Sequence, residues 1–230
     1  MKDSILKLKR KEKHTLRDLE KLRGFLGEKY IDNVFFHNHL GNDKYVQEYP
    51  KLQYKLIKNT LSILTIEDMI EINKQLFEEL DYININGDII FDIEKEIQIT
   101  NENVEYAGDE MYEYKFVTPY LPLNEKNFKR YLKGEYTMEQ AVTNNILEVL
   151  KGLGIRLEKE QRIFVKTNFE KSNRTLKDIK MVSFGGTFLT NIKFPDYFSI
   201  GKRKSLGYGT FVKLKGEGQP KYKEDSQSAI

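Results

Sequence analysis

Residues 4–27, SILKLKRKEKHTLRDLEKLRGFLG, contain the first two elements of the chain and predict how its fold begins. Over 4–12, apolar residues stand among lysines in a stretch typical of a strand. Thr15 followed by Asp18 forms a capping box for a helix, and Gly27 suits the end of that helix. Between them the apolar residues fall on one helical face: Leu16, Leu19, Leu22, Phe25 and Leu26. A strand followed by an amphipathic helix is therefore predicted.

Working outward, residues 1–108 predict one complete domain. Two short strands near 49–57 and 60–65 follow a polar loop, with a turn between them at Lys58-Asn59. Thr65 with Asp68 opens a second helix. A last strand is expected to place alternate apolar residues on one side: Ile89, Phe91, Ile93, Ile97 and Ile99. The order βαββαβ is that of a ferredoxin-like domain.

Residues 109–215 repeat this pattern in modified form. Strands are expected over 111–117, 161–169, 178–192 and 210–214, and helices over 124–133 and from Thr137 onward. The predicted fold class is therefore α+β, with two tandem ferredoxin-like domains and a glycine-rich loop near the end of the second. The polar residues 216–230 are expected to form a disordered tail.

Composition excludes several function classes. The 230 residues contain no cysteine, which rules out disulfides, thiolate metal sites and a cysteine nucleophile. With three histidines, only histidine and carboxylate metal sites remain open. No apolar run reaches the ~20 residues of a membrane span, and the lysine-rich start lacks the apolar core of a signal peptide. A cytoplasmic protein without membrane contact is expected.

The net charge of +3 hides a strong asymmetry along the chain. Residues 30–110 carry a net charge of −11, whereas residues 161–215 carry +9. A concentrated positive segment is typical of proteins that bind a polyanion such as nucleic acid. The alternative is that these lysines protect exposed strand edges from aggregation.

The positive segment includes a glycine-punctuated loop, GKRKSLGYG at 201–209. Its glycines permit backbone amides to face a phosphate, its three cations are candidates to grip one, and its tyrosine is expected to pack beneath the loop or stack on a base. The loop is not a P-loop, because no GxxxxGK[ST] is present. A charged hairpin turn remains the alternative. The candidate RNA-binding residues are Gly201, Lys202, Arg203, Lys204, Ser205, Gly207, Tyr208 and Gly209.

A second candidate site is His37-Asn38-His39, in the polar loop after the first helix. Metal-free cleavage of RNA needs a base for the 2′-hydroxyl, an acid for the leaving 5′-oxygen and a cation to stabilise the phosphorane. Histidine suits both proton-transfer roles near neutral pH. Two alternatives stay open: histidines that only cap a helix or bond to backbone, and a metal site completed by Asp32 or Asp43.

Four blocks of the sequence together match a known family. They are Leu22–Gly27, Phe36–His39 with Tyr49–Lys55, Tyr112–Asn124 (YEYKFVTPYLPLN), and Phe194–Tyr197 with the glycine-rich loop. In these blocks the chain resembles the CRISPR-associated endoribonucleases of the sixth Cas family, which process precursor CRISPR RNA. The resemblance is closest to the branch with a His-Asn-His segment.

The resemblance implies paired ferredoxin-like domains of the RAMP type that cut within repeat RNA without metal or cofactor. The products would be a 2′,3′-cyclic phosphate and a 5′-hydroxyl. It points to His37 and His39 as the acid/base pair, with Lys29 and Tyr49 as supporting residues. Tyr45 or Tyr54 are alternatives to Tyr49.

CRISPR repeat RNA is the partner that the resemblance implies, bound in the cleft between the domains. Assembly as a homodimer or within a CRISPR effector complex is left open. The alternative function is a catalytically silent RNA-binding subunit of such a complex.

Overall fold

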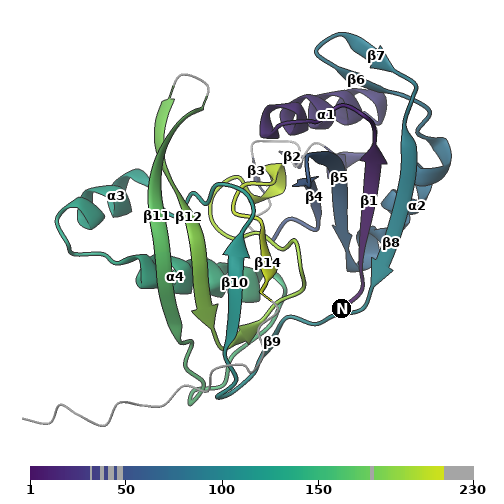
Figure 1. Cartoon of the computed structure of the whole chain (residues 1–230). Helices are drawn as coiled ribbons and strands as arrows, with labels where there is room; N and C mark the ends of the chain where they lie inside the picture. The colour runs from purple at the N-terminus through teal and green to yellow at the C-terminus, as the bar shows by residue number, and fades with distance from the viewer. Residues whose placement is uncertain (32, 37–38, 41–43, 46–48, 177–178, 215–230) are drawn as a thin grey trace, which may run out of the picture.

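The computed structural model describes residues 1–31, 33–36, 39–40, 44–45, 49–176 and 179–214 and shows two sheet-containing domains side by side (Figure 1). The expected tail, residues 216–230, lies outside the described residues. Within the described part, no helix combines the length and apolar character needed to cross a membrane.

The first domain has the predicted βαββαβ order. Its main elements are β1 (Asp3–Lys9), α1 (Leu16–Lys29), β4 (Leu52–Ile57), β5 (Thr60–Ile66), α2 (Ile70–Glu79) and β8 (Glu94–Thr100). The strands form an antiparallel sheet in the order β4-β5-β1-β8, which is the ferredoxin-like arrangement. The capping box of α1 is present, since the Thr15 amide donates to Asp18 Oδ2 at 2.8 Å. The helix before β6 begins later than predicted, because Thr65 and Ile66 stay in β5 and a 3₁₀ turn, η2 (Glu67–Met69), precedes α2.

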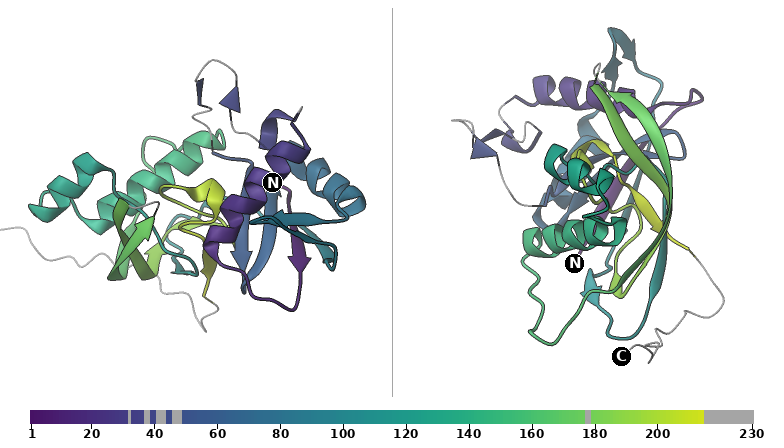
Figure 2. Two further views of the ribbon diagram at one scale, coloured as in Figure 1. Left: turned by 90° about the horizontal axis from the view of Figure 1, so that it is seen from above. Right: turned by 90° about the vertical axis from the view of Figure 1, so that its left-hand side faces the viewer.

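The second domain has the same strand order with one helix missing. Its elements are β10 (Tyr112–Phe116), α3 (Glu125–Leu132), α4 (Met138–Gly152), β11 (Val165–Leu176), β12 (Ile179–Thr190) and β14 (Phe211–Lys213). The sheet order is β11-β12-β10-β14, and the long β11–β12 hairpin extends beyond it (Figure 2). Between β12 and β14, where every residue is described, the chain forms β13 (Ile192–Lys193), which pairs with β9 (Glu105–Tyr106), and the 3₁₀ turn η3 (Lys204–Leu206).

Both faces of the first domain's sheet contribute buried residues. Leu6, Leu8 and Ile63 pack with α1 and α2 in one hydrophobic cluster. Ile5, Leu64 and Ile66, which point the other way, belong to the cluster that forms the core of the second domain. The two domains therefore pack through this sheet, and much of the expected cleft between them is filled by apolar side chains.

The predicted strand over 89–99 is wrong in its first half. Asn86 and Gly87 both have positive φ, at 59° and 94°, and turn the chain into a hairpin of β6 (Ile83–Ile85) and β7 (Asp88–Ile90). The expected buried face is wrong as well, since Ile89, Phe91 and Ile99 are 58%, 71% and 51% exposed. The hairpin packs beside α1, outside the main sheet, and β8 is an edge strand.

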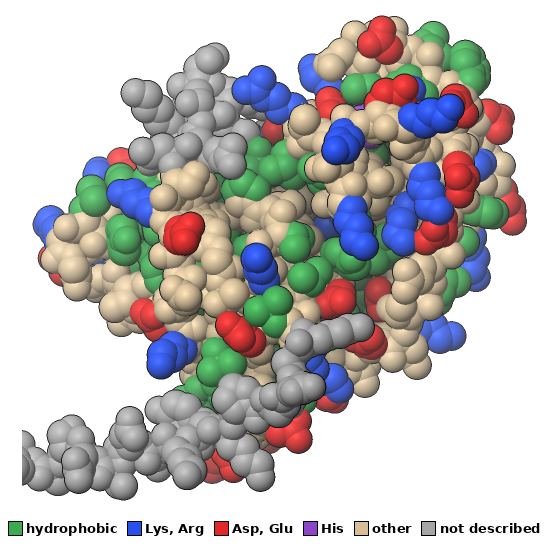
Figure 3. Space-filling model, viewed as in Figure 1, with side chains coloured by type: hydrophobic (Ala, Val, Ile, Leu, Met, Phe, Trp, Pro, Cys, Tyr) green, Lys and Arg blue, Asp and Glu red, His purple; other side chains and the backbone are tan. Residues whose placement is uncertain are grey.

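The surface over β1 and β8 mixes both signs of charge. In Figure 3, Lys and Arg side chains alternate there with Asp and Glu. Lys7 pairs with Glu96 at 2.6 Å, and Lys9 pairs with Glu94 at 3.1 Å. These ion pairs neutralise the cations of β1, so this face has no single-sign patch that would attract a polyanion.

Candidate functional site

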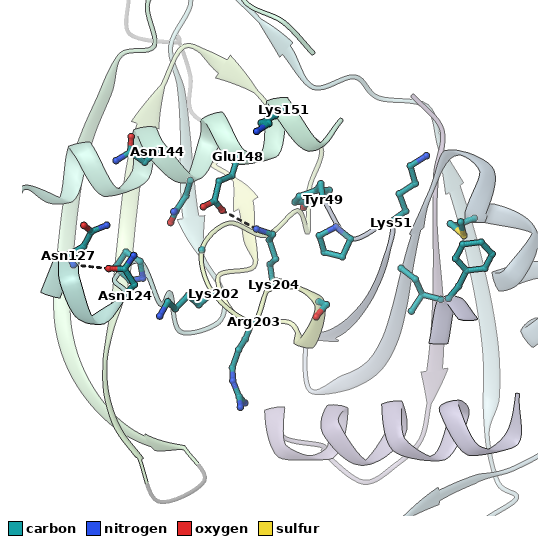
Figure 4. Close-up of a pocket in the computed structure, with 18 of the residues that line it drawn as sticks. Tyr49, Lys51, Asn124, Asn127, Asn144, Glu148, Lys151, Lys202, Arg203 and Lys204 are labelled. Atoms are coloured by element: carbon teal, nitrogen blue, oxygen red, sulfur yellow. Dashed lines mark hydrogen bonds and ion pairs between the residues drawn. The ribbon is translucent and has the colours of Figure 1, made fainter. Parts of the chain in front are cut away.

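A groove of about 760 Å³ lies where the two domains meet beside the glycine-rich loop (Figure 4). The first domain contributes mostly apolar residues to its wall, namely Phe35, Pro50, Leu52 and Met69, together with Tyr49 and Lys51. The second domain contributes polar residues, among them Asn144, Glu148 and Lys151 of α4 together with Gly201–Ser205. Apolar surface opposite amides and cations suits an unpaired nucleotide, whose base is apolar on its faces and whose phosphate is anionic.

The glycines of the loop allow close packing rather than leave the backbone open to a ligand. Gly207 has a φ of +76°, and a Cβ there would lie 2.8 Å from Leu19 Cδ1 and 2.9 Å from the Tyr54 carbonyl oxygen. A Cβ on Gly201 would meet the Tyr120 ring at 2.7 Å, and one on Gly209 would clash with the carbonyl of Ile200. The loop therefore fits tightly between α1, β4 and the second domain.

Most of the loop's amides already have partners. The amide of Lys202 donates to the Leu121 carbonyl at 2.9 Å, and that of Gly209 donates to the Pro119 carbonyl at 2.8 Å. The amides of Leu206, Gly207 and Tyr208 donate to carbonyls within the loop. The expectation that glycine-rich backbone presents these amides to a phosphate is therefore wrong for these five positions, because the fold uses their N–H groups internally.

The three cations of the loop differ in environment. Arg203 points toward α1, where its guanidinium pairs with Glu20 at 2.6 Å. Lys204 pairs with Glu148 of α4 at 3.2 Å. Lys202 is exposed, and no ion pair to it occurs among the described residues. Lys202 is consequently the cation of this loop most available to a phosphate, whereas the other two must leave carboxylates to reach one.

The loop's tyrosine faces inward. Tyr208 is 5% exposed, so of its two predicted arrangements the structure shows packing beneath the loop. Ser205 is half-buried and lines the groove.

Tyr49 is also a core residue in this structure. It is 2% exposed, its ring stacks on Phe198 at 5.6 Å, and its hydroxyl donates to the Ser199 carbonyl at 3.1 Å. Burial raises the pKa of this hydroxyl to about 12. Tyr49 is among the residues that line the groove, but its hydroxyl would have to leave Ser199 to support a phosphate. The alternative Tyr54 is equally buried at 2% exposure.

Lys29 lies in the last turn of α1, with its ammonium 4.4 Å from the centre of the Tyr82 ring. The rings of Phe25 and Tyr30 lie at 5.9 and 5.8 Å from the same nitrogen. Cation–π contacts of this kind hold a lysine without neutralising it. Among the described residues that line the groove Lys29 does not occur, so the structure does not bring it together with the cationic loop.

The candidate histidines can be placed only through their neighbours. His37 lies outside the described residues, and His39 is described only in its backbone, which pairs with Tyr45 between β2 (His39–Leu40) and β3 (Lys44–Tyr45). Phe35, two residues before His37, lines the groove, and the next residue, Phe36, is anchored by stacking on Tyr30 at 5.2 Å. The 3₁₀ turn η1 (Val34–Phe36) therefore leads from the groove wall into the histidine segment.

The alternative metal ligands Asp32 and Asp43 lie outside the described residues, so the structure does not describe that arrangement.

No motif or spacing in the sequence indicates that α4 forms the polar wall of the groove. The sequence pattern around Asn144, Asn145 and Glu148 is that of an ordinary amphipathic helix. It does not indicate that these residues face another domain. Lys55 is fully buried, yet its sequence context is the same as that of a surface lysine on a strand.

Comparison with known proteins supports the sequence-based family identification. The Cas6b N-terminal domain profile matches residues 1–105, and the Cas6b C-terminal domain profile matches residues 106–214. The chain belongs to the Cas6b family. The resemblance to the sixth Cas family, a family of endoribonucleases, is thereby confirmed.

Solved structures agree over nearly the whole chain. The chain is similar to a crystal structure of Cas6b, with 30% identity, a TM-score of 0.78 and coverage of 93% of this chain and 100% of that one. It is also similar to the crystal structure of CRISPR RNA processing endoribonuclease Cas6b, with 26% identity, a TM-score of 0.66 and the same coverage. A RAMP protein that binds different RNA substrates, at 12% identity and a TM-score of 0.52, shares the fold alone.

One curated relative covers part of the chain. An uncharacterized protein of Methanocaldococcus jannaschii is 29% identical over 113 residues, which are 47% of this chain and 76% of the relative.

Proposed function

We propose that the protein is an endoribonuclease that cuts CRISPR repeat RNA without a metal ion, using His37 and His39. The observation that supports this most directly is the groove, whose lining includes both Phe35, at the entrance to the histidine segment, and the cationic loop with Lys202. A phosphate held at that loop would lie in the same groove as Phe35, from which the chain leads into the histidine segment.

The proposed reaction needs only two proton transfers. One histidine takes the proton of the 2′-hydroxyl, whose oxygen attacks the adjacent phosphorus. The bond from phosphorus to the 5′-oxygen breaks, and the other histidine donates a proton to that oxygen. The products are a 2′,3′-cyclic phosphate and a 5′-hydroxyl. Either histidine can be the base, and the two exchange protonation states during the reaction.

Cations assist by stabilising the extra negative charge of the phosphorane. Lys202 is proposed to hold a phosphate. Lys29 lies apart from that loop and is proposed as a supporting cation on the side of the histidine segment, because Tyr30 beside it stacks on Phe36 and the surrounding rings leave its charge intact. Arg203 and Lys204 would contribute after exchanging their carboxylate partners for phosphate. Tyr49 is not included, since its hydroxyl is bonded to Ser199.

The test is cleavage of repeat RNA in EDTA. We expect cleavage to persist there, and to stop when the nucleotide before the cut carries a 2′-deoxyribose, because the attacking oxygen is then absent. His37→Ala and His39→Ala should each lower the single-turnover rate by about 10²-fold or more, with binding retained. His14→Ala is a matched control, since His14 lies at the start of α1 beside Asp18.

Cleavage of the 2′-deoxy substrate, or loss of cleavage in EDTA, would contradict this mechanism. RNA binding without any cut product would instead identify a catalytically silent RNA-binding subunit. Sedimentation of the protein with and without repeat RNA would show whether it acts as a monomer or a homodimer.

A further inference from the structure

Lys55 of β4 is a fully buried lysine without a carboxylate partner among the described residues. Its exposure is 0%, and its Nζ donates to Ser199 Oγ at 2.5 Å. A buried ammonium needs a counter-ion to offset its loss of hydration, and no ion pair of the described chain involves Lys55. Burial correspondingly holds the pKa of this amine well below its usual range.

The lysine begins a hydrogen-bonded chain that runs beneath the glycine-rich loop. Ser199 Oγ lies 2.9 Å from Thr210 Oγ1, which donates to the Gly207 carbonyl at 2.9 Å. Thr118 Oγ1 donates to the same carbonyl at 2.6 Å. Ser199 and Thr210 also bracket the loop, and their backbones form a bridge. One side chain of the first domain thus contacts the base of the loop that carries the second domain's cations.

Tyr49 attaches the same point of the loop to the first domain. Its hydroxyl donates to the Ser199 carbonyl, and the Ser199 amide donates back to it at 3.2 Å. Ser199 is therefore held by two side chains from the first domain, and both come from the segment that leads into and forms β4. Gly201, two residues later, is the first loop residue that lines the groove.

We propose that Lys55 is a positioning residue that fixes the glycine-rich loop against the first domain and so sets the cationic edge of the groove. This inference rests on the proposed function only in that the groove is where RNA binds. Lys55 itself cannot contact RNA, because it is sealed from solvent. Any effect of Lys55 on RNA binding must therefore be indirect and depend on the position of residues 199–210.

The first test needs no RNA. In Lys55→Met, which keeps the length of the side chain and removes the amine, hydrogen exchange of the amides over 199–210 should accelerate about tenfold or more. Exchange in α2 and β11 should be unchanged. The matched control is Lys58→Met in the exposed β4–β5 turn, which also removes a lysine and should leave exchange as in the wild type. Unaltered exchange over 199–210 in Lys55→Met would overturn the inference.

The second test separates positioning from direct contact with phosphate. Lys55→Met should weaken binding of repeat RNA by about fivefold or more, while the slope of log K against log salt stays as in the wild type. Lys202→Met should lower that slope by about one, because it removes a charge that meets phosphate. A slope lowered by Lys55→Met would overturn the positioning role, because it would show that the charge of Lys55 itself acts on phosphate. Unchanged affinity would also overturn it, because it would show that the loop's position does not affect binding.

A third variant guards against a folding defect. If Lys55→Met melts well below the wild type, Ser199→Ala tests the same contact from the other side, and the double variant should lose less stability than the sum of the two single losses. If the two losses are fully additive, the contact between Lys55 and Ser199 is not the cause of the effects, and the inference is overturned. If the wild type binds RNA without cutting it, the proposed catalysis fails, while the exchange and salt results still decide the role of Lys55.

Discussion

Individual side chains decide how much positive charge the groove offers to RNA. Lys202, Arg203 and Lys204 are consecutive, yet carboxylates from two different helices engage the second and third. An RNA phosphate must therefore displace Glu20 or Glu148 before it gains those cations. The loop's affinity is set by this competition, and a count of its lysines and arginines overestimates it.

Neutralising Glu148 should consequently strengthen RNA binding. Lys204 and Glu148 are 3.2 Å apart, with side-chain exposures of 21% and 61%, so the pair is a partly exposed one. We expect Glu148→Gln to tighten binding about two- to fourfold at low salt, with the gain shrinking as salt screens the charges. Fluorescence anisotropy with labelled repeat RNA measures this.

Glu125→Gln is the matched control, because Glu125 pairs with Lys129 on the exposed face of α3. An equal gain from both variants would mean that only net charge matters. Weaker binding by Glu148→Gln would show that Glu148 itself contacts the RNA.

At the scale of elements, the glycine-rich loop replaces a helix. In the first domain α2 precedes the last strand, whereas in the second domain an irregular segment with η3 precedes β14. Leu206 of η3 packs against the core of the first domain, and Gly207 lies against α1 and β4. The segment that distinguishes the second domain from the first is thus also the one that joins them.

Gly207→Ala should therefore destabilise the protein more than a positive φ alone explains. Its φ of +76° strains any side chain, and the new Cβ would also press on Leu19 and on the Tyr54 carbonyl. We expect a loss of about 2–4 kcal/mol in the free energy of unfolding, measured by urea denaturation. Gly87→Ala, at a φ of +94° with nothing within 4 Å, should lose only about 1 kcal/mol. Equal losses would mean that the contact is easily relieved.

At the scale of the whole molecule, the first domain's sheet serves two cores. One face packs on α1 and α2, and the other completes the core of the second domain. Lys55 lies on β4 within this junction and contacts Ser199 across it. A titratable group inside the contact between domains makes the stability of the whole protein depend on pH.

The sign of that dependence follows from the lowered pKa of Lys55. In the unfolded chain, Lys55 keeps its proton up to its ordinary pKa of 10.5. In the folded chain, it loses that proton at a lower pH, because its pKa is lowered. Stability should therefore rise with pH between the folded and the unfolded pKa, by at most about 1.4 kcal/mol per pH unit. Urea denaturation from pH 7 to 9 measures the slope, and Lys55→Met should reduce it.

The range stops at pH 9 because tyrosine acts in the opposite sense. Burial raises the pKa of Tyr49 to about 12, so its contribution to stability is complete below pH 10 and is lost as the pH rises through 12. A wild-type slope equal to that of Lys55→Met would show that Lys55 keeps its proton in the folded state.

The amino-acid sequence by itself determined the order and type of the main elements, since capping residues and apolar periodicity are local. The Thr15 and Thr137 capping boxes and the turn at Lys58-Asn59 are all present in the structure. The sequence also contained the Asn86-Gly87 turn signal, which the apolar alternation around it obscured. The pattern therefore predicted one strand where the structure has a hairpin, because apolar residues can alternate across a hairpin as they do along a single strand.

Only the tertiary structure decided which residues face the groove and which face the other domain. Lys55 and Tyr49 are buried because a second domain covers the outer face of β4, and Arg203 is paired because α1 brings Glu20 beside it. A side chain's burial and charge partners depend on residues far away in the chain, such as Ser199 at 144 positions from Lys55. Spacing along the sequence does not contain that information, because it records neighbours on one element and not the packing between elements.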